Sequence, residues 1–167
     1  MEKVMSQPRA LTFNSPLETG IRALAVLVAA HPRSFDLQRL MGFDHLVVHT
    51  GDIGGPKSLH PKLPMRSAEM LVRRKLVENG LMLMASRGLV ERIIDPQGIH
   101  YRAAELAAPV MSSMTTPYSA ALQECAGWAV ETFASLDDTM FRAAMARFFE
   151  QWVEEFQAVQ HSLAVDL

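Results

Sequence analysis

The sequence predicts a mainly α-helical fold with one β-hairpin, and three observations support this prediction. Three segments before residue 90 place apolar residues at helical spacing. The pattern then changes to two short runs rich in β-branched and aromatic residues, LVERIID and GIHYRAA, separated by the turn sequence DPQG. Helical spacing returns afterwards. Three helices followed by a hairpin is the order of a winged-helix domain, so we expect a winged-helix-like domain over residues 13–105 and a C-terminal helical extension over residues 106–167.

The first helix is predicted to begin at the sequence NSPLE. Ser15 can cap the helix, Pro16 suits its first turn, and Glu18 completes a capping box. The apolar run IRALAVLVAA follows and should end before His31 and Pro32, because the residue that precedes a proline is pushed out of helical geometry. Since this helix is apolar on nearly all sides, we expect it at the centre of the core.

Two further helices are predicted before the hairpin. One begins after Ser34, with Asp36 in its first turn. Its end stays open, because LVVH suits either a last helical turn or a short strand. The other is capped by Ser67 and ends at Gly88, and the dipeptide Asn79-Gly80 leaves open a bend or a break within it.

The C-terminal part is predicted to form additional helices. One or two of them occupy the segment up to residue 134, interrupted near Pro109 and Pro117, and a final helix is capped by Ser135. The final helix carries apolar residues every three or four positions, at Phe141, Met145, Phe148, Trp152, Phe156 and Val159. Such a stripe either packs on the protein's own core or docks a second chain, and the pattern favours neither.

The composition predicts a soluble, cytoplasmic protein without membrane contact. The chain has 167 residues, of which 49% are hydrophobic, which suffices for one domain with a core. It contains no apolar run of the length that a membrane span or a signal peptide needs. The single cysteine, Cys125, lies in a helix-like apolar segment, so we expect a buried thiol in a reducing compartment.

The charges are unevenly distributed although the net charge is only −2. Residues 66–92 carry six basic and three acidic side chains, whereas residues 120–167 carry two basic and eight acidic ones. This asymmetry suggests that the two halves face different partners, and a solvated charged surface is the simpler alternative.

A long loop is predicted over residues 49–66, and its sequence GDIGGPKS differs by one residue from a nucleotide-binding P-loop. Pro56 stands where the P-loop requires a glycine, and a proline has no N–H to bind phosphate. Pro61 and Pro64 also prevent the helix that should follow. The sequence therefore disfavours nucleotide binding at this loop.

Metal binding and catalysis are disfavoured as well. His45 and His49 are four residues apart, with Asp52 and His60 nearby, but neither an HExxH motif nor a cysteine pair accompanies them. Ser58 lies near His60 without a GxSxG motif. We therefore expect no cofactor, no metal site and no catalytic residue, that is, a protein that is not an enzyme.

Basic residues offer a physical route to DNA. Arg73, Arg74 and Lys75 lie on the third helix, which enters the major groove in winged-helix proteins, and Arg92 and Arg102 lie on the hairpin together with His100. The alternatives are an acidic protein surface or solvent. Because the basic residues are few and the net charge is balanced, we expect DNA contact to be at most an auxiliary role.

Several motifs resemble a known family. They are NSPLE, HPRSFDLQRL, HTGD, SLHP, MRSAEMLVRR, and SRGLVER followed by GIHYRA. On these motifs residues 13–134 resemble the second middle-component family of three-gene ABC-ATPase conflict systems, which includes Lamassu-like anti-phage and anti-plasmid operons. The final helix from Ser135 lies outside the resemblance.

The resemblance implies a non-enzymatic subunit of a hetero-oligomer, encoded between an effector and an SMC-like or Rad50-like ABC ATPase. Such a subunit would bridge the ATPase heads and help to hold a nuclease or another effector inactive until foreign DNA is sensed. It would touch DNA, if at all, as part of the complex. The resemblance agrees with the predicted fold, because winged-helix accessory subunits occur in SMC complexes.

Two sets of residues are then candidates for partner contacts, one in the loop and one in the final stripe. They are His49, Asp52, Lys57, His60 and Arg66, and Phe148, Trp152 and Phe156. The competing hypothesis is a free-standing winged-helix transcription regulator in which Arg73, Arg74 and Lys75 read DNA.

Overall fold

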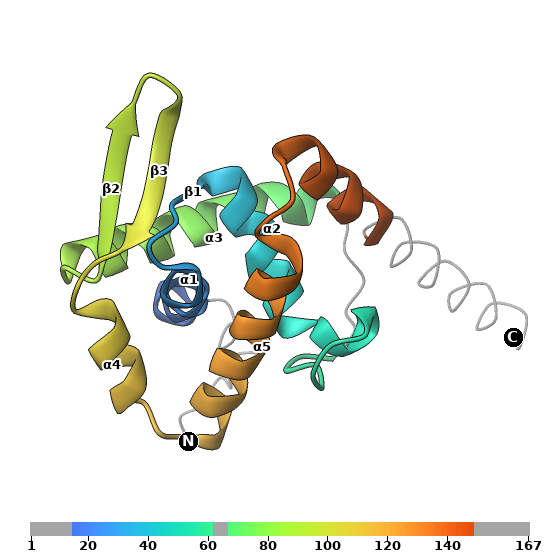
Figure 1. Ribbon diagram of the computed structural model, residues 1–167, viewed down its shortest axis with the longest axis horizontal. Coiled ribbons are helices and arrows are strands. Elements are labelled where there is room, and N and C mark those ends of the chain that lie inside the picture. Colours follow the sequence, from blue (N-terminus) through green and yellow to red (C-terminus); the bar gives the residue numbers. More distant parts are fainter. Residues whose placement is uncertain (1–14, 62–66, 149–167) are drawn as a thin grey trace, which may run out of the picture.

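The computed structural model describes residues 15–61 and 67–148, except for the side chains of residues 67–71, and it is mainly helical with a small antiparallel sheet (Figure 1). The elements follow in the order α1 (Pro16–Ala30), β1 (Phe35–Asp36), α2 (Leu37–Val48), the 3-10 helix η2 (Thr50–Ile53), α3 (Ser67–Ser86), β2 (Val90–Asp95), β3 (Gly98–Ala103), α4 (Ala107–Ser113) and α5 (Pro117–Phe133). A further helix occupies residues 138–148. The predicted fold class, helices with a hairpin, is confirmed.

The sheet has three strands in the order β1-β3-β2. The hairpin lies where it was predicted, and Asp95 pairs with Gly98 across its turn. The short strand β1 was not predicted, since Phe35 and Asp36 were assigned to the second helix. Phe35 pairs with Tyr101 of β3 and stacks on Phe43 of α2 at 5.2 Å between ring centroids. With β1 between α1 and α2, the chain has the element order of a winged-helix domain.

Helix α1 lies at the centre of the core, as its composition predicted. Ser15 Oγ accepts a hydrogen bond from the Glu18 N–H at 3.2 Å, which confirms the predicted cap. Helices α2, α3, α4 and α5 and strand β3 all contact α1. Its side chains are therefore buried around nearly the whole circumference, including Leu24 and Leu27 at 0% exposure.

Helix α3 is one continuous helix through Asn79 and Gly80, so the break that the sequence left open does not occur. Gly80 instead allows α3 to approach α1. A Cβ atom on Gly80 would lie 2.6 Å from the Gly20 nitrogen, and one on Gly20 would lie 2.8 Å from the Gly80 carbonyl oxygen. A glycine pair at the crossing point lets the two backbones pack closely.

Three helix boundaries differ from the predictions. Helix α2 begins at Leu37 and not directly after Ser34, because Phe35 and Asp36 form β1. Asp36 caps it, and its Oδ1 accepts a hydrogen bond from the Arg39 N–H at 2.8 Å. Pro109 lies in the first turn of α4 and does not interrupt it, since a proline costs no hydrogen bond there. Helix 138–148 is capped by Asp137 and not by Ser135. The Met140 N–H donates a hydrogen bond to Asp137 Oδ1 at 2.8 Å.

The other boundaries agree with the sequence patterns. The segment LVVH forms the last turn of α2, which ends at Val48. Helix α5 begins at Pro117 and is capped by Thr116. Helices α4 and α5 pack against α1, so the C-terminal helices share its core.

The apolar stripe of the last described helix begins as part of the core. Phe141 is 3% exposed, and Gly42 makes room for it, because a Cβ on Gly42 would lie 2.7 Å from Phe141 Cε1. Phe148 packs edge-to-face on Phe133 at 5.9 Å between ring centroids. Met145 is also packed against the core. Trp152, Phe156 and Val159 lie outside the described residues.

Candidate functional site

The loop after α2 is folded back on itself by hydrogen bonds. Thr50 Oγ1 donates to the Pro56 carbonyl at 2.8 Å, and the Gly51 N–H donates to Ser58 Oγ at 3.0 Å. At its far end, the N–H groups of Leu59 and His60 both donate to the Val48 carbonyl at 3.1 Å. The part of the loop that the structure describes, residues 49–61, is therefore a closed turn held against the end of α2.

Helix α5 packs against the loop through Trp128 and Cys125. A Cβ on Gly55 would lie 2.7 Å from the indole ring of Trp128, so glycine is required for the loop to lie flat on that ring. Thr50 Oγ1 also contacts Cys125 Sγ at 3.3 Å, and this thiol faces the Lys57 carbonyl at 3.8 Å. Cys125 is 1% exposed and burial raises its pKa, so the predicted buried thiol is confirmed.

His45 of α2 and His49 at the start of the loop are both buried. His49 is 7% exposed, and its ring lies 4.6 Å from that of His45 between centroids. His49 Nδ1 lies 3.9 Å from Asp52 Oδ2. Burial, with smaller contributions from the positive charge of Arg73 and from His49, lowers the pKa of His45 to about 2. Within residues 15–61 and 67–148, no group of three or more potential ligands could hold a metal ion.

A buried ion cluster joins α1, α2 and α3. Arg22 of α1 donates from Nε to Asp44 Oδ1 of α2 at 2.7 Å, and Arg73 of α3 donates to Asp44 Oδ2 at 2.8 Å. The side chains of Arg22 and Asp44 are 4% and 2% exposed. Because both oxygens of one buried carboxylate bind a guanidinium, the cluster fixes the relative positions of α1, α2 and α3.

His60 and Tyr118 extend this cluster toward the surface. His60 Nε2 lies 3.3 Å from the Tyr118 hydroxyl, and their rings stack at 6.5 Å between centroids. Burial lowers the pKa of His60, and the charge of Arg22 lowers it further. Burial raises the pKa of Tyr118, against an opposing effect of Arg22. The loop is thereby connected to α5 and to the ion cluster.

Sequence reasoning missed Arg22, Asp44 and Tyr118. A signal existed for Arg22, because it is the one charged residue of the apolar run IRALAVLVAA, and a charge on a buried helix needs a partner. The sequence contained no comparable signal for its partner Asp44, which lies on a different helix.

The residues proposed for DNA contact are not equally available. Arg73 belongs to the buried cluster, and Arg102 donates from Nε and Nη2 to Glu91 Oε2 at 3.1 and 2.6 Å. Lys75 Nζ lies 4.0 Å from Glu78, in an exposed contact of little strength. Arg74 and Arg92 are exposed. The structure thus leaves Arg74, Lys75 and Arg92 at the surface of α3 and the hairpin.

Among the remaining candidates for partner contact, Lys57 is exposed and His60 is half-buried. Phe148 is packed on Phe133. Arg66, Trp152 and Phe156 lie outside the described residues. The structure therefore separates the loop candidates into inner supports, the buried His49 and the partly buried Asp52, and the more exposed Lys57 and His60.

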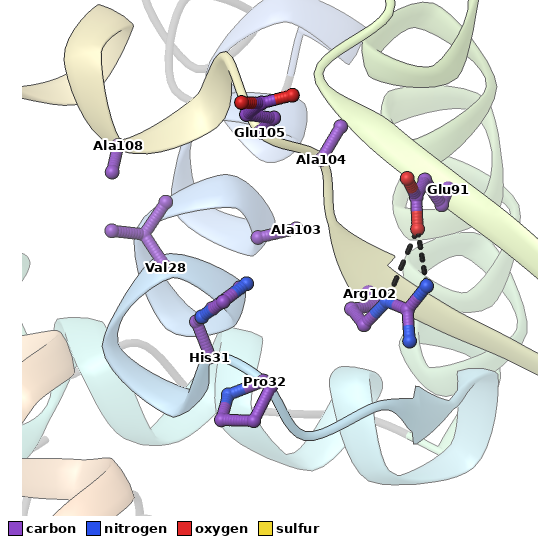
Figure 2. A pocket seen from close by; sticks show the side chains of 9 residues that line it. All are labelled: Val28, His31, Pro32, Glu91, Arg102, Ala103, Ala104, Glu105 and Ala108. Carbon is purple, nitrogen blue, oxygen red and sulfur yellow. Dashed lines mark hydrogen bonds and ion pairs between the residues drawn. The ribbon is translucent and has the colours of Figure 1, made fainter.

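An open pocket lies at the base of the hairpin, between the end of α1, the two strands and the start of α4 (Figure 2). Val28, Ala103 and Ala108 form its apolar wall. Figure 2 shows Glu91 and Arg102 at one side, bonded to each other. Glu91 and Arg102 are therefore engaged with each other, and the rest of the lining is His31, Pro32, Ala104 and Glu105.

A comparison with protein families gives a match over most of the chain. The family model described as ABC-three component (ABC-3C) system Middle Component 2 matches residues 12–155. No curated protein and no solved structure matches the chain significantly. In the structure, no helix among the described residues has the length and apolarity that crossing a membrane requires.

Proposed function

The chain belongs to the Middle Component 2 family of ABC-three component systems, and from this membership we propose that it is the non-enzymatic subunit that links the ABC ATPase of such a system to an effector. The system would act in defence against phages or plasmids. The ATPase partner would be SMC-like or Rad50-like, and the subunit would help to hold an effector, such as a nuclease, inactive until foreign DNA is sensed.

The observation that carries this proposal is the construction of the loop. An unsupported glycine-rich loop would lose conformational entropy on binding, which weakens the contact. Here the hydrogen bonds to Val48 and Pro56 and the contact with Trp128 hold the loop before any partner arrives. A preorganised loop with an exposed Lys57 is suited to a protein surface with acidic groups.

Within this loop we assign different tasks to the candidate residues. His49 and Asp52 hold the loop from inside, since His49 is buried and contacts the Asp52 carboxylate. Lys57 and His60 would contact the ATPase directly. Arg66 belongs to the same proposed contact.

A second contact would join the subunit to the effector. The stripe residues from Phe141 to Phe148 pack on the core, so they hold the C-terminal helix in place. We assign the effector contact to Trp152 and Phe156. Replacing both with serine should leave the isolated subunit folded and abolish assembly, whereas loss of the folded subunit alone would show that these residues belong to the core.

The loop contact is tested by co-expression of the three components of the system. We expect Lys57→Glu to abolish or strongly reduce co-purification of the ATPase, because an attractive charge becomes repulsive at a preorganised surface. The matched control is Arg87→Glu, which reverses another exposed positive charge, near the end of α3, and should leave assembly unchanged. Wild-type co-purification by the Lys57→Glu protein would contradict the proposed loop contact.

The exposed Arg74, Lys75 and Arg92 favour a second candidate function, a free-standing winged-helix transcription regulator. Against it, Arg73 and Arg102 are engaged within the protein. Tight, salt-sensitive binding of the isolated protein to one operator-like sequence would support the regulator and contradict the bridging subunit.

A further inference from the structure

Strand β2 forms an open edge of the sheet. In the order β1-β3-β2 it has a single neighbour, and Figure 1 shows no other ribbon of the described chain beside its outer side. It spans six residues, Val90–Asp95, without a proline or a bulge. Proteins normally protect such edges with prolines, bulges, charged side chains or a covering segment, because an open edge pairs readily with another chain. Of these devices β2 has the charged side chains Glu91, Arg92 and Asp95.

The backbone groups that face outward can be identified from the hydrogen bonding. The Ala104 N–H donates to the Leu89 carbonyl at 2.9 Å, so this pair is hydrogen-bonded. Directly opposed pairs in an antiparallel ladder alternate between bonded and non-bonded. Val90, Arg92 and Ile94 are therefore non-bonded to β3, and their N–H and C=O groups point away from it toward the open edge.

The same edge exposes apolar surface and a positive charge. Ile94 pairs with Ile99 across the hairpin, and these side chains are 71% and 39% exposed. Arg102 is bonded to Glu91, and His100 lies 3.7 Å from Asp95. Arg92 is exposed and has no ion-pair partner within residues 15–61 and 67–148. A segment that binds this edge would thus meet the Ile94 side chain and the Arg92 guanidinium, which can donate hydrogen bonds to a carboxylate.

Charge opposes pairing of this edge with a second copy of itself. In such a pair, the outward N–H and C=O groups of one β2 strand must bind those of the other. Two antiparallel registers meet this condition with five paired residues, one over residues 90–94 and one over residues 91–95. One register puts Arg92 opposite Arg92, and the other puts Glu91 opposite Asp95 twice. Like charges directly opposite one another destabilise a sheet. The sequence of β2 therefore disfavours self-association and leaves the edge to a complementary strand.

We propose that the β2 edge binds an extended segment of a partner protein, which adds to the sheet as an antiparallel strand and places an acidic residue opposite Arg92 and an apolar residue opposite Ile94. Main-chain hydrogen bonds to Arg92 and Ile94 provide affinity in this mode, and the side chains provide specificity. This site lies on the hairpin, apart from the loop. It is therefore additional to the proposed ATPase contact, and its test is independent of that contact.

The test uses the full-length protein and a synthetic peptide, Thr-Val-Thr-Glu-Thr-Val-Thr, which places glutamate opposite Arg92 and valine opposite Ile94. Amide hydrogen exchange is measured by NMR with and without excess peptide. We expect the N–H groups of Arg92 and Ile94 to exchange at least about tenfold more slowly at saturation, while those of Glu91 and Ile93, already bonded to β3, change little. A peptide that binds without forming a strand would not protect alternate amides of β2 in this way.

Charge specificity is tested with matched peptides and variants. The peptide with lysine in place of glutamate should bind about two- to thirtyfold more weakly, since an attractive cross-strand pair that contributes about 0.2–1 kcal/mol is replaced by a repulsive pair of similar size. Arg92→Glu should reverse this preference, and Arg87→Glu should not. Ile94→Pro removes one outward N–H without breaking a β2–β3 hydrogen bond, so it should abolish peptide binding while the protein stays folded.

Three results would overturn the proposal. They are the absence of protection at millimolar peptide, equal protection of alternate β2 amides, and protection of the Arg92 amide by duplex DNA but not by the peptide. The last result would assign the hairpin to nucleic acid.

Discussion

At the residue scale, the carboxylate of Asp44 supports three helices at once. Asp44→Asn would leave the buried Arg22 guanidinium without its countercharge, so we expect a loss of about 3–5 kcal/mol in the free energy of unfolding. Glu91→Gln is the control, because the Glu91 and Arg102 side chains are 49% and 41% exposed and such pairs contribute about 0–1 kcal/mol. Urea denaturation measures both. A cost for Asp44→Asn no larger than that of the control would refute the structural role of the cluster.

His45 makes a second prediction at this scale. Its pKa is about 2 in the folded protein and about 6.5 in the unfolded chain, because burial, Arg73 and His49 disfavour the imidazolium. The unfolded state therefore binds the additional proton below pH 6.5. The contribution of His45 to the free energy of unfolding is therefore fully present above pH 6.5. It falls as the pH drops toward 2, by up to about 1.4 kcal/mol per pH unit.

The measurement is the free energy of unfolding between pH 7 and pH 4.5, for wild type and for His45→Gln. The variant should show a shallower slope, whereas an unchanged slope would mean that His45 is not the group responsible. The lowered pKa of His60 acts in the same direction, so His60→Gln serves as the comparison and should have a smaller effect, because His60 is less buried.

At the element scale, the crossing of α1 and α3 depends on Gly20 and Gly80. Gly80→Ala would place Cβ 2.6 Å from the Gly20 nitrogen and 3.1 Å from the Pro16 carbonyl oxygen, where only backbone could move. We expect a loss of about 1–3 kcal/mol, as in overpacked cores. Gly127→Ala in α5 meets nothing within 4 Å and should instead stabilise the protein by up to about 1 kcal/mol through helix propensity. Thermal unfolding of both variants tests this prediction. If Gly80→Ala were also stabilising, the close packing of α1 on α3 at Gly20 and Gly80 would be contradicted.

Arg39 makes the other prediction at the element scale, because it fixes helix 138–148. Its guanidinium donates to the carbonyls of Ala134 and Leu136 at 3.2 and 2.9 Å and to Asp138 at 2.8 Å, and its carbon lies 4.7 Å from the centroid of the Phe141 ring. Arg39→Met keeps an unbranched apolar side chain but loses these bonds. The bonds from the charged guanidinium to the two carbonyls contribute about 1.5–3 kcal/mol each. The bond to Asp138 contributes about 0–1 kcal/mol, because the Asp138 side chain is 71% exposed.

Hydrogen exchange measured by mass spectrometry should therefore show residues 138–148 of the Arg39→Met protein exchanging at least about tenfold faster, with α1 unchanged. Arg142→Met is the control, since Arg142 is exposed and its Nε lies 3.4 Å from the Asp138 carbonyl within the same helix. Equal effects of the two variants would argue against Arg39 as the anchor.

At the scale of the whole molecule, the described surface of α3 and the hairpin predicts weak DNA binding. Of the candidate cations, Arg73 and Arg102 are engaged within the protein, which leaves Arg74, Lys75 and Arg92. Each phosphate contact contributes about −0.9 to the slope of log K against log salt, so the isolated subunit should show a slope no steeper than about −3 on duplex DNA. Fluorescence anisotropy over a salt series measures it, and a slope near −6 would require a larger DNA-binding surface.

Much of the architecture could be read from local patterns, because the forces that place a helix end or a hairpin turn act over a few residues. Ser15 with Pro16 fixed the start of α1, and DPQG fixed the turn between β2 and β3. The errors arose where a distant residue decided the outcome. Phe35 forms a strand and not a helix because Tyr101 pairs with it. At Asn79-Gly80, where the sequence left a break open, the helix continues and Gly80 packs against Gly20.

The sequence by itself determined the fold class, the exclusion of a P-loop through Pro56, and the family. The tertiary structure alone decided which polar residues are buried together, since Arg22, Asp44 and Arg73 lie on three helices and no spacing along the chain relates them. It also decided that Arg73 and Arg102 are engaged within the protein, and that Lys57 faces outward while His49 faces inward. Helix and turn signals are local in the chain, whereas burial and charge pairing depend on distances that exist only after the chain has folded.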